Sequence, residues 1–172
     1  KNLSSIFFSS LGNASREIFH INKENNTSHK RFFYNIGAMG HVSQIALTFK
    51  QFKKNKKVVI VDGDGSIQMQ LGNLLKIGQS NLKLLHIVFV NECHESTGGH
   101  ELGVKRVDYK KIFESFGYND VKIIKNVKNF KNELKKNYVK TKALIIRIRP
   151  GTISNLPRPD LAPDKLKKIF IK

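Results

Sequence analysis

A short glycine-rich motif with one acidic side chain is the part of this sequence best suited to chemistry. The motif Gly63-Asp64-Gly65-Ser66 follows an apolar run at residues 58–61 after one intervening residue, and a second apolar run at residues 84–90 is followed by Asn91. Glycines let the backbone bend tightly and approach a ligand closely. Asp64 and Asn91 carry the hard oxygen atoms that Mg²⁺ prefers. The pattern therefore predicts a divalent-metal site that can hold a diphosphate.

Gly-Asp-Gly is also a common turn sequence, in which glycines permit positive φ angles and the aspartate bonds its own backbone. The neighbouring residues favour the metal site. Two strands that end at one edge of an open α/β sheet face the crevice where such sheets bind ligands. Apolar residues recur at helical spacing after Ser66, so we expect Ser66 to cap a helix whose free amides attract an anion.

The elements that would position this site alternate along the chain. We expect strands at residues 32–34, 58–61, 84–90, 121–124 and 143–148, and helices that begin near residues 15, 42, 66, 109, 127 and 165. Residues 1–11 show no clean periodicity, and we assign no element there. Strands alternating with helices predict a parallel sheet covered on both faces. The expected fold class is α/β, a three-layer α/β/α arrangement with a mostly parallel sheet, in one domain spanning residues 1–172.

The segments between these elements also carry information. Residues 92–103 are polar and contain glycine, and they are too long for a tight turn, so we expect an active-site loop there. Asp108 is expected to cap the helix that follows, and Gly117 to end it. The turn at residues 63–66 departs from the Gly-x-Gly-x-x-Gly fingerprint, which disfavours a nicotinamide cofactor.

Composition bounds the class of protein. A chain of 172 residues with 40% apolar residues can build a proper core. The sequence has no apolar stretch long enough to span a membrane, and Cys93 is its single cysteine, so we expect a cytoplasmic protein. The formal charge of +18 comes mainly from scattered lysines without a recognised DNA-binding motif, so we expect no nucleic-acid partner. The positive charge would still attract anionic ligands.

Several motifs resemble those of thiamine-diphosphate-dependent 2-oxoacid decarboxylases, and in particular of phosphonopyruvate and sulfopyruvate decarboxylases. The matching segments cover nearly the whole chain and comprise residues 12–17, 37–41, 63–66 with Asn91, 94–99 and 149–151. The run His-Glu-Ser-Thr-Gly-Gly at residues 94–99 is the most restrictive of them. The resemblance implies a thiamine-diphosphate-binding fold of the diphosphate-binding type, with thiamine diphosphate and Mg²⁺ as cofactors.

The resemblance also implies the ligands of the metal and of the diphosphate. Asp64 and Asn91 would bind Mg²⁺ together with the backbone carbonyl of Cys93. The backbone amides of Gly65 and Ser66 would meet the diphosphate. Relatives usually have two adjacent asparagines where this chain has Val-Asn, and because only the second is a ligand, the departure costs little.

Further residues of the cofactor site follow from the same resemblance. Met39 would support the bent cofactor beneath its thiazolium ring, although methionine is also an ordinary filler of apolar cores. The carbonyl of Gly37 would accept a hydrogen bond from the amino group of the cofactor. The remaining residues expected to line the cofactor are Ala38, Gly63 and His94.

The loop that begins at His94 is the candidate for substrate contact and proton handling, with His94, Glu95, Ser96 and Thr97 as the catalytic set. The two hydroxyl groups and the amides of the following glycines could cradle a phosphonate or sulfonate. A zinc site is disfavoured because neither a cysteine pair nor a His-Glu-x-x-His motif accompanies the histidines. Arg16 either contacts substrate or pairs with its neighbour Glu17.

Enzymes of this family build each active site between a diphosphate-binding and a pyrimidine-binding domain, and this chain resembles only the first. We expect it to need a pyrimidine-binding domain or subunit within a homo- or hetero-oligomer. The leading reaction is decarboxylation of a small 2-oxoacid, 3-phosphonopyruvate, to phosphonoacetaldehyde and CO₂. One alternative is a sulfopyruvate decarboxylase beta-type subunit or another 2-oxoacid lyase, and the other is a catalytically inactive basic binding protein that retains the fold.

Overall fold

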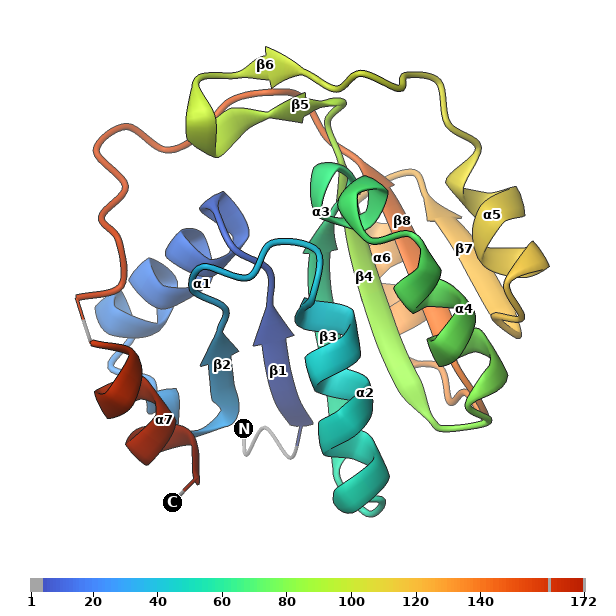
Figure 1. The fold of residues 1–172 in the computed structure, drawn as a ribbon, viewed down its shortest axis with the longest axis horizontal. Coiled ribbons are helices and arrows are strands. Elements are labelled where there is room, and N and C mark those ends of the chain that lie inside the picture. The colour runs from blue at the N-terminus through green and yellow to red at the C-terminus, as the bar shows by residue number, and fades with distance from the viewer. Residues whose placement is uncertain (1–4, 161, 172) are drawn as a thin grey trace.

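A six-stranded parallel sheet runs through the computed structural model, which describes residues 5–160 and 162–171 (Figure 1). Its strands, in the order in which they lie side by side, are β2 (Phe32–Tyr34), β1 (Ser5–Ser9), β3 (Lys57–Gly63), β4 (Leu84–Val90), β8 (Lys142–Arg147) and β7 (Asp120–Ile124). Every neighbouring pair is parallel. The carboxyl ends of all six strands therefore meet at one edge of the sheet.

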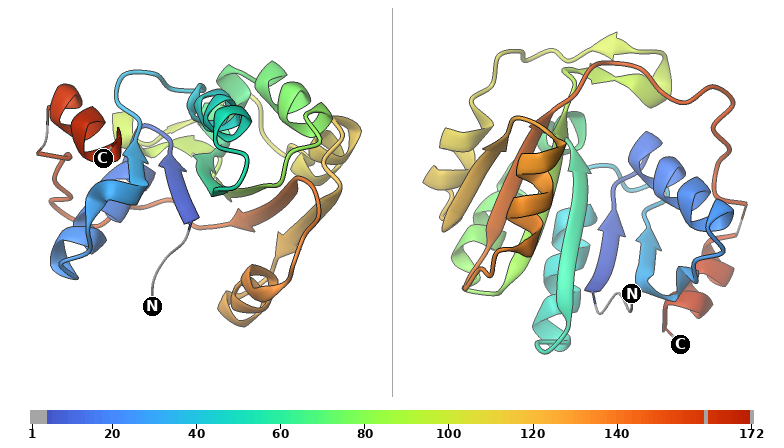
Figure 2. Two further views of the ribbon diagram at one scale, coloured as in Figure 1. Left: turned by 90° about the horizontal axis from the view of Figure 1, so that it is seen from below. Right: turned by 180° about the vertical axis from the view of Figure 1, so that it is seen from behind.

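Helices cover both faces of this sheet, which confirms the three-layer α/β/α fold (Figure 2). One face carries α2 (Val42–Phe52), α4 (Gly72–Gln79) and α5 (Tyr109–Ser115), and the other carries α1 (Asn13–Glu24) and α6 (Val127–Lys135). The short α3 (Asp64–Met69) follows β3, and α7 (Pro163–Ile171) packs beside β2. Within the described residues, no helix is both long enough and apolar enough to cross a bilayer.

The central strands are buried on both faces. Along β3, Val58 and Ile60 pack into the apolar cluster beneath α2, α4 and α5. Val59 and Val61 point the other way, into the cluster that includes residues of α1 and α6. A parallel strand of this kind reads as a continuous apolar run, which is why the sequence reveals it clearly.

Strand β1 is an element that the sequence analysis did not assign. It lies between β2 and β3, and its Phe7 aligns with Phe32 on one side and Val59 on the other. The segment is only five residues long and is bounded by serines. A short central strand shows no alternation of polar and apolar residues, and so periodicity could not identify it. Residues 1–4 of the unassigned segment lie outside the described part of the chain.

The expectation that Ser66 caps a helix was wrong. Helix α3 begins at Asp64, with Gly63 at the cap position, so Ser66 lies inside the first turn. Its Oγ accepts a hydrogen bond from the backbone amide of Gly40 at 3.2 Å. The single helix expected here is also two helices, because α3 ends at Met69 and α4 begins three residues later.

The expected active-site loop contains a small hairpin. Strand β5 (Cys93–His94) pairs antiparallel with β6 (His100–Glu101), and a 3₁₀ turn (Glu95–Thr97) connects them. Beyond it, the Asp108 side chain accepts a hydrogen bond from the backbone amide of Lys111 at 3.1 Å, which confirms the predicted cap of α5. Gly117 adopts φ +96 directly after that helix, as expected of a residue that ends it.

Ion pairs connect helix α6 to strands β8 and β7 of the sheet. Lys142, at the start of β8, is 1% exposed, and its Nζ lies 2.7 Å from a Glu133 carboxylate oxygen and 3.2 Å from one of Asp120. Glu133 is the one buried residue of α6. Hydrogen bonds from Lys136 and Lys142 lower the pKa of Glu133 from its ordinary value of 4.5 to about 2. The ion cluster therefore stabilises the packing of α6 while the carboxylate is ionised.

We expect Glu133→Gln to destabilise the protein by about 2 kcal/mol at pH 7, between the values typical of exposed and of fully buried pairs. The folded-state pKa lies below the unfolded one, so this contribution is complete above pH 4.5 and is lost as the pH falls toward 2. Urea unfolding of both proteins across this range measures it. The exposed carboxylate of Glu114 is the control, and an equal loss in Glu114→Gln would contradict the account.

Candidate metal and diphosphate site

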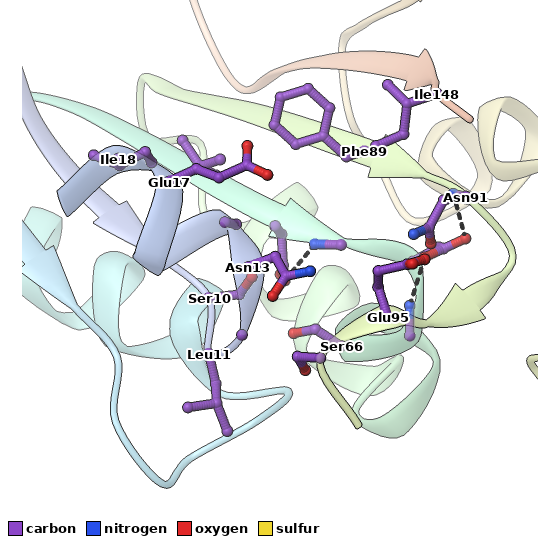
Figure 3. A pocket seen from close by; sticks show the side chains of 18 of the residues that line it. Ser10, Leu11, Asn13, Glu17, Ile18, Ser66, Phe89, Asn91, Glu95 and Ile148 are labelled. Carbon is purple, nitrogen blue, oxygen red and sulfur yellow. Dashed lines mark hydrogen bonds between the residues drawn. The ribbon is translucent and has the colours of Figure 1, made fainter. Parts of the chain in front are cut away.

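A cavity of about 530 Å³ opens at the carboxyl ends of β1, β3 and β4, beneath the hairpin (Figure 3). This edge is where open α/β sheets bind ligands. Of the residues expected from the sequence, the cavity lining includes Met39, Gly63, Asp64, Gly65, Ser66, Asn91, Cys93, His94, Glu95 and Ser96. The structure thus brings together most of the expected set from three separate segments. Gly37, Ala38 and Thr97 are not part of this lining.

The carboxylate of Asp64 accepts hydrogen bonds from three backbone amides of the site. Its side chain is 2% exposed, and its Oδ1 accepts a hydrogen bond from the Gly65 amide at 2.9 Å. Its Oδ2 accepts from the amides of Asn91 at 3.1 Å and Glu92 at 2.7 Å. Burial raises the pKa of Asp64 above its usual value, and the amide hydrogen bonds counter part of this rise. The carboxylate is held in one orientation, with lone-pair capacity left on Oδ1.

Asn91 is fixed beside this carboxylate. Its side-chain Oδ1 accepts a hydrogen bond from the Cys93 amide at 3.3 Å, so the side chain folds over the turn that leaves β4. Among the described residues, no three His, Cys, Asp or Glu side chains gather as a metal-ligand cluster. One carboxylate, one amide oxygen and nearby backbone carbonyls form a donor set of hard oxygens, and such a set fits Mg²⁺.

Gly65 allows His94 to approach the start of α3. A Cβ atom on Gly65 would lie 2.8 Å from His94 Cε1 and 2.9 Å from its Nδ1, which is closer than van der Waals contact permits. The absence of a side chain at Gly65 therefore lets the imidazole ring pack directly on the residue that follows Asp64. The packing connects the hairpin to the turn after β3.

The turn that carries Met39 is tied to the same helices. Gly40 has φ +84, its amide donates to Ser66, and its carbonyl accepts a hydrogen bond from the Asn73 side chain at 3.0 Å. Asn35 adds a hydrogen bond to the carbonyl of Ala38. These contacts hold the Met39 side chain at the cavity wall.

The hairpin contributes titratable groups of different character. Cys93 Sγ donates a hydrogen bond to Glu95 Oε2 at 2.8 Å, and burial together with this carboxylate raises the pKa of Cys93 to about 12. The thiol therefore stays protonated and is a poor nucleophile. Thr97 Oγ1 and the Gly99 amide both donate to the carbonyl of His94, at 3.2 and 3.1 Å. These two donors are engaged within the turn, unlike the free anion cradle expected from the sequence.

Helix α1 brings two polar side chains to the opposite wall of the cavity. Asn13 and Glu17, one turn apart, both line it (Figure 3). Within the described residues, Asn13 Nδ2 is buried without a hydrogen-bond partner. Burial raises the pKa of Glu17 above its usual value. Residues 12–17 match a family motif that assigned no role to Asn13, although its i, i+4 spacing from Glu17 was a signal that both side chains face the same way.

Comparison with known proteins agrees with this geometry. The family model of the C-terminal TPP binding domain of thiamine pyrophosphate enzymes matches residues 10–148. The chain belongs to this family. Thiamine pyrophosphate is another name for thiamine diphosphate. The family model therefore names the same cofactor that the resemblance implied.

Relatives of this domain include parts of longer enzymes and a separate subunit. Phosphonopyruvate decarboxylase of Streptomyces viridochromogenes is 30% identical over 165 residues, which are 94% of this chain but only 40% of that protein. Sulfopyruvate decarboxylase subunit beta of Methanothermobacter thermautotrophicus is 31% identical over 163 residues, which are 94% of this chain and 83% of that subunit. The fold recurs in benzoylformate decarboxylase from Polynucleobacter necessarius, with a TM-score of 0.58 at 17% identity over 72% of this chain and 26% of that one.

Adding a methyl group at Gly65 tests the packing of the site. We expect Gly65→Ala to displace the His94 ring and to lower stability by about 1 kcal/mol, because overpacking outweighs the gain in helix propensity. A Cβ on Gly72, at the start of α4, would meet no atom within 4 Å, so Gly72→Ala is the matched control and should lose nothing. Urea unfolding and the NMR signals of the His94 ring measure both effects. Equal stability of the two variants, with unmoved ring signals, would contradict the packing argument.

Proposed function

We propose that this chain is the cofactor-diphosphate-binding half of a thiamine-diphosphate- and Mg²⁺-dependent 2-oxoacid decarboxylase, with 3-phosphonopyruvate as its leading substrate. The observation that carries the proposal is the buried carboxylate of Asp64 beside Asn91 at the cavity, in a chain that belongs to the thiamine pyrophosphate-binding family. We assign the ion to Asp64, Asn91 and the backbone carbonyl of Cys93. The diphosphate would meet the turn at residues 63–66.

The residues of the chain would have separate tasks around that cofactor. Bound thiamine diphosphate would supply the electron sink that makes loss of CO₂ from a 2-oxoacid feasible. Met39 lines the cavity from a turn held by Gly40, and its side chain would support the ring system of the cofactor. His94 and Glu95 are titratable groups of the hairpin at the cavity, and we assign proton handling to the imidazole nitrogens and the carboxylate oxygens.

The apolar rim of the cavity supports the need for a partner. Leu11, Ile21 and Ile148 line the cavity and yet are 38%, 50% and 43% exposed. Exposed apolar side chains around a pocket mark an interaction surface. We propose that a pyrimidine-binding domain or subunit covers this rim in a homo- or hetero-oligomer of the cytoplasm. The chain spans 40% of the phosphonopyruvate decarboxylase it matches, which leaves room in such a protein for that domain.

The second candidate function is that of a sulfopyruvate decarboxylase beta-type subunit. A relative with that name matches the chain over 83% of its own length, whereas the match covers less than half of the phosphonopyruvate enzyme. Both reactions remove CO₂ from a small 2-oxoacid with a second acidic group. The residues assigned to the metal and diphosphate would serve either substrate, so the choice depends on other residues of the lining, and we assign substrate contact to Glu95 and Ser96 among them.

Cofactor binding gives the first test. We expect thiamine diphosphate and Mg²⁺ together to raise the melting temperature of the chain, because a ligand that binds the folded state stabilises it. Asp64→Asn should abolish the rise, since it removes the carboxylate that would bind the ion. Asp108→Asn is the matched control, because asparagine caps a helix as well as aspartate does. A rise that persists in Asp64→Asn would contradict the ligand assignment, and its absence in the unaltered chain would favour an inactive binding protein.

Turnover gives the second test. We expect the chain alone to release little CO₂ from phosphonopyruvate, sulfopyruvate or pyruvate, because the cavity is open on its apolar rim. Addition of a pyrimidine-binding subunit or domain should restore turnover, and a coupled aldehyde assay with the three acids identifies the substrate. Rapid decarboxylation by the isolated chain would refute the half-site proposal.

A further inference from the structure

Glu92 stands at the junction between the candidate metal site and the hairpin. It follows Asn91 at the end of β4 and has φ +59, which is the left-handed region that residues with a side chain rarely adopt. Such a conformation persists only where surrounding contacts hold it, and it is often found at functional sites. The contacts of Glu92 show what holds it here.

The backbone of Glu92 bonds in two directions. Its amide donates to Asp64 Oδ2 at 2.7 Å, the shortest of the three hydrogen bonds to that carboxylate. Its carbonyl accepts a hydrogen bond from the amide of Leu102 at 2.9 Å, just beyond the hairpin. One residue therefore joins the buried carboxylate to both sides of the hairpin.

The side-chain carboxylate of Glu92 makes a second set of contacts, with Arg147 and Arg106, which we call the clasp. Its Oε1 accepts hydrogen bonds from Arg147 Nη1, at the end of β8, and from the backbone amide of Arg106, both at 3.3 Å. Arg106 also has a positive φ, of +56, so the returning chain is turned sharply where the clasp meets it. The neighbouring Glu101 carboxylate, by contrast, pairs with Lys105 and is largely exposed.

We propose that Glu92 is a positioning residue for the metal site, and that its carboxylate holds the left-handed turn by clasping Arg147 and the Arg106 amide. This proposal rests on the proposed function and assigns a role to a residue that the sequence motifs passed over. The turn places the Glu92 amide on Asp64 and fixes where Asn91 and Cys93 lie on either side. Without the clasp, the backbone is free to leave its unfavourable conformation and to carry these oxygens away from the ion.

The test compares Glu92→Ala with Glu92→Gln in the full chain. The amide oxygen of glutamine still accepts the hydrogen bonds from Arg147 and Arg106, whereas alanine accepts none. We expect the Mg²⁺ concentration that half-maximally stabilises the chain with thiamine diphosphate to rise about tenfold or more in Glu92→Ala, as for other residues that orient metal ligands. In Glu92→Gln it should stay within about threefold of the original value. Trypsin cleavage after Arg106 should accelerate in Glu92→Ala and in neither Glu92→Gln nor Glu101→Ala.

Glu101→Ala is the matched control, because it removes an exposed carboxylate from the same hairpin, and it should leave the Mg²⁺ midpoint unchanged. The proposal is overturned if Glu92→Ala keeps the original midpoint, if Glu101→Ala shifts it equally, or if Glu92→Gln loses as much as Glu92→Ala. If the unaltered chain gains no stability from the cofactor, the proposed function fails instead. The trypsin rates then decide by themselves whether the clasp holds the hairpin, and equal rates in all variants would overturn it.

Discussion

The buried carboxylate of Asp64 accepts hydrogen bonds from the amides of Gly65, Asn91 and Glu92, and so it joins the end of β3 to the end of β4. Removing a carboxylate from water is costly unless hydrogen bonds replace the water. Two parallel strands meet that need by presenting amides at one edge of the sheet. The other features of the site follow from this constraint. Gly65 must lack a side chain so that His94 can approach, and Glu92 must adopt a left-handed conformation so that its amide reaches Asp64.

The layers of the fold were predictable because their signals are local. Continuous apolar runs identified β3 and β4, and helical spacing identified α2, since burial on both faces or on one face leaves these patterns in the sequence. The sequence could not reveal β1, a five-residue strand that lies between two others, because its identity as a strand comes from partners distant in the chain. The break between α3 and α4 was also hidden. It falls at Gln70, whose φ of −138 and ψ of 54 leave the helical region.

The site was predictable where one motif carries several residues. The turn at residues 63–66 and Asn91 meet at the cavity, as the adjacency of parallel strands requires. The spacing of Asn13 and Glu17 showed only that both face the same way, and the contact of α1 with the cavity was not predictable. The contribution of Glu92 was hidden because it depends on contact between the end of β4 and Arg147, which is distant in the chain. The anion cradle loses two of its four expected donors for a different reason. Thr97 and Gly99 use their donors on the carbonyl of His94, a local turn that a list of residue types cannot reveal.

The family assignment and the geometry together lead to one claim, that Asp64 and Asn91 hold the metal ion that binds the diphosphate of thiamine. A crystal structure of the chain with Mn²⁺, as a substitute for Mg²⁺, and thiamine diphosphate tests this claim most directly, because Mn²⁺ scatters anomalously. The account predicts one anomalous peak within about 2.3 Å of Asp64 Oδ1, Asn91 Oδ1 and the carbonyl oxygen of Cys93, slightly beyond Mg–oxygen distances. A peak elsewhere, or an ion held by the diphosphate without contact to Asp64, would contradict it.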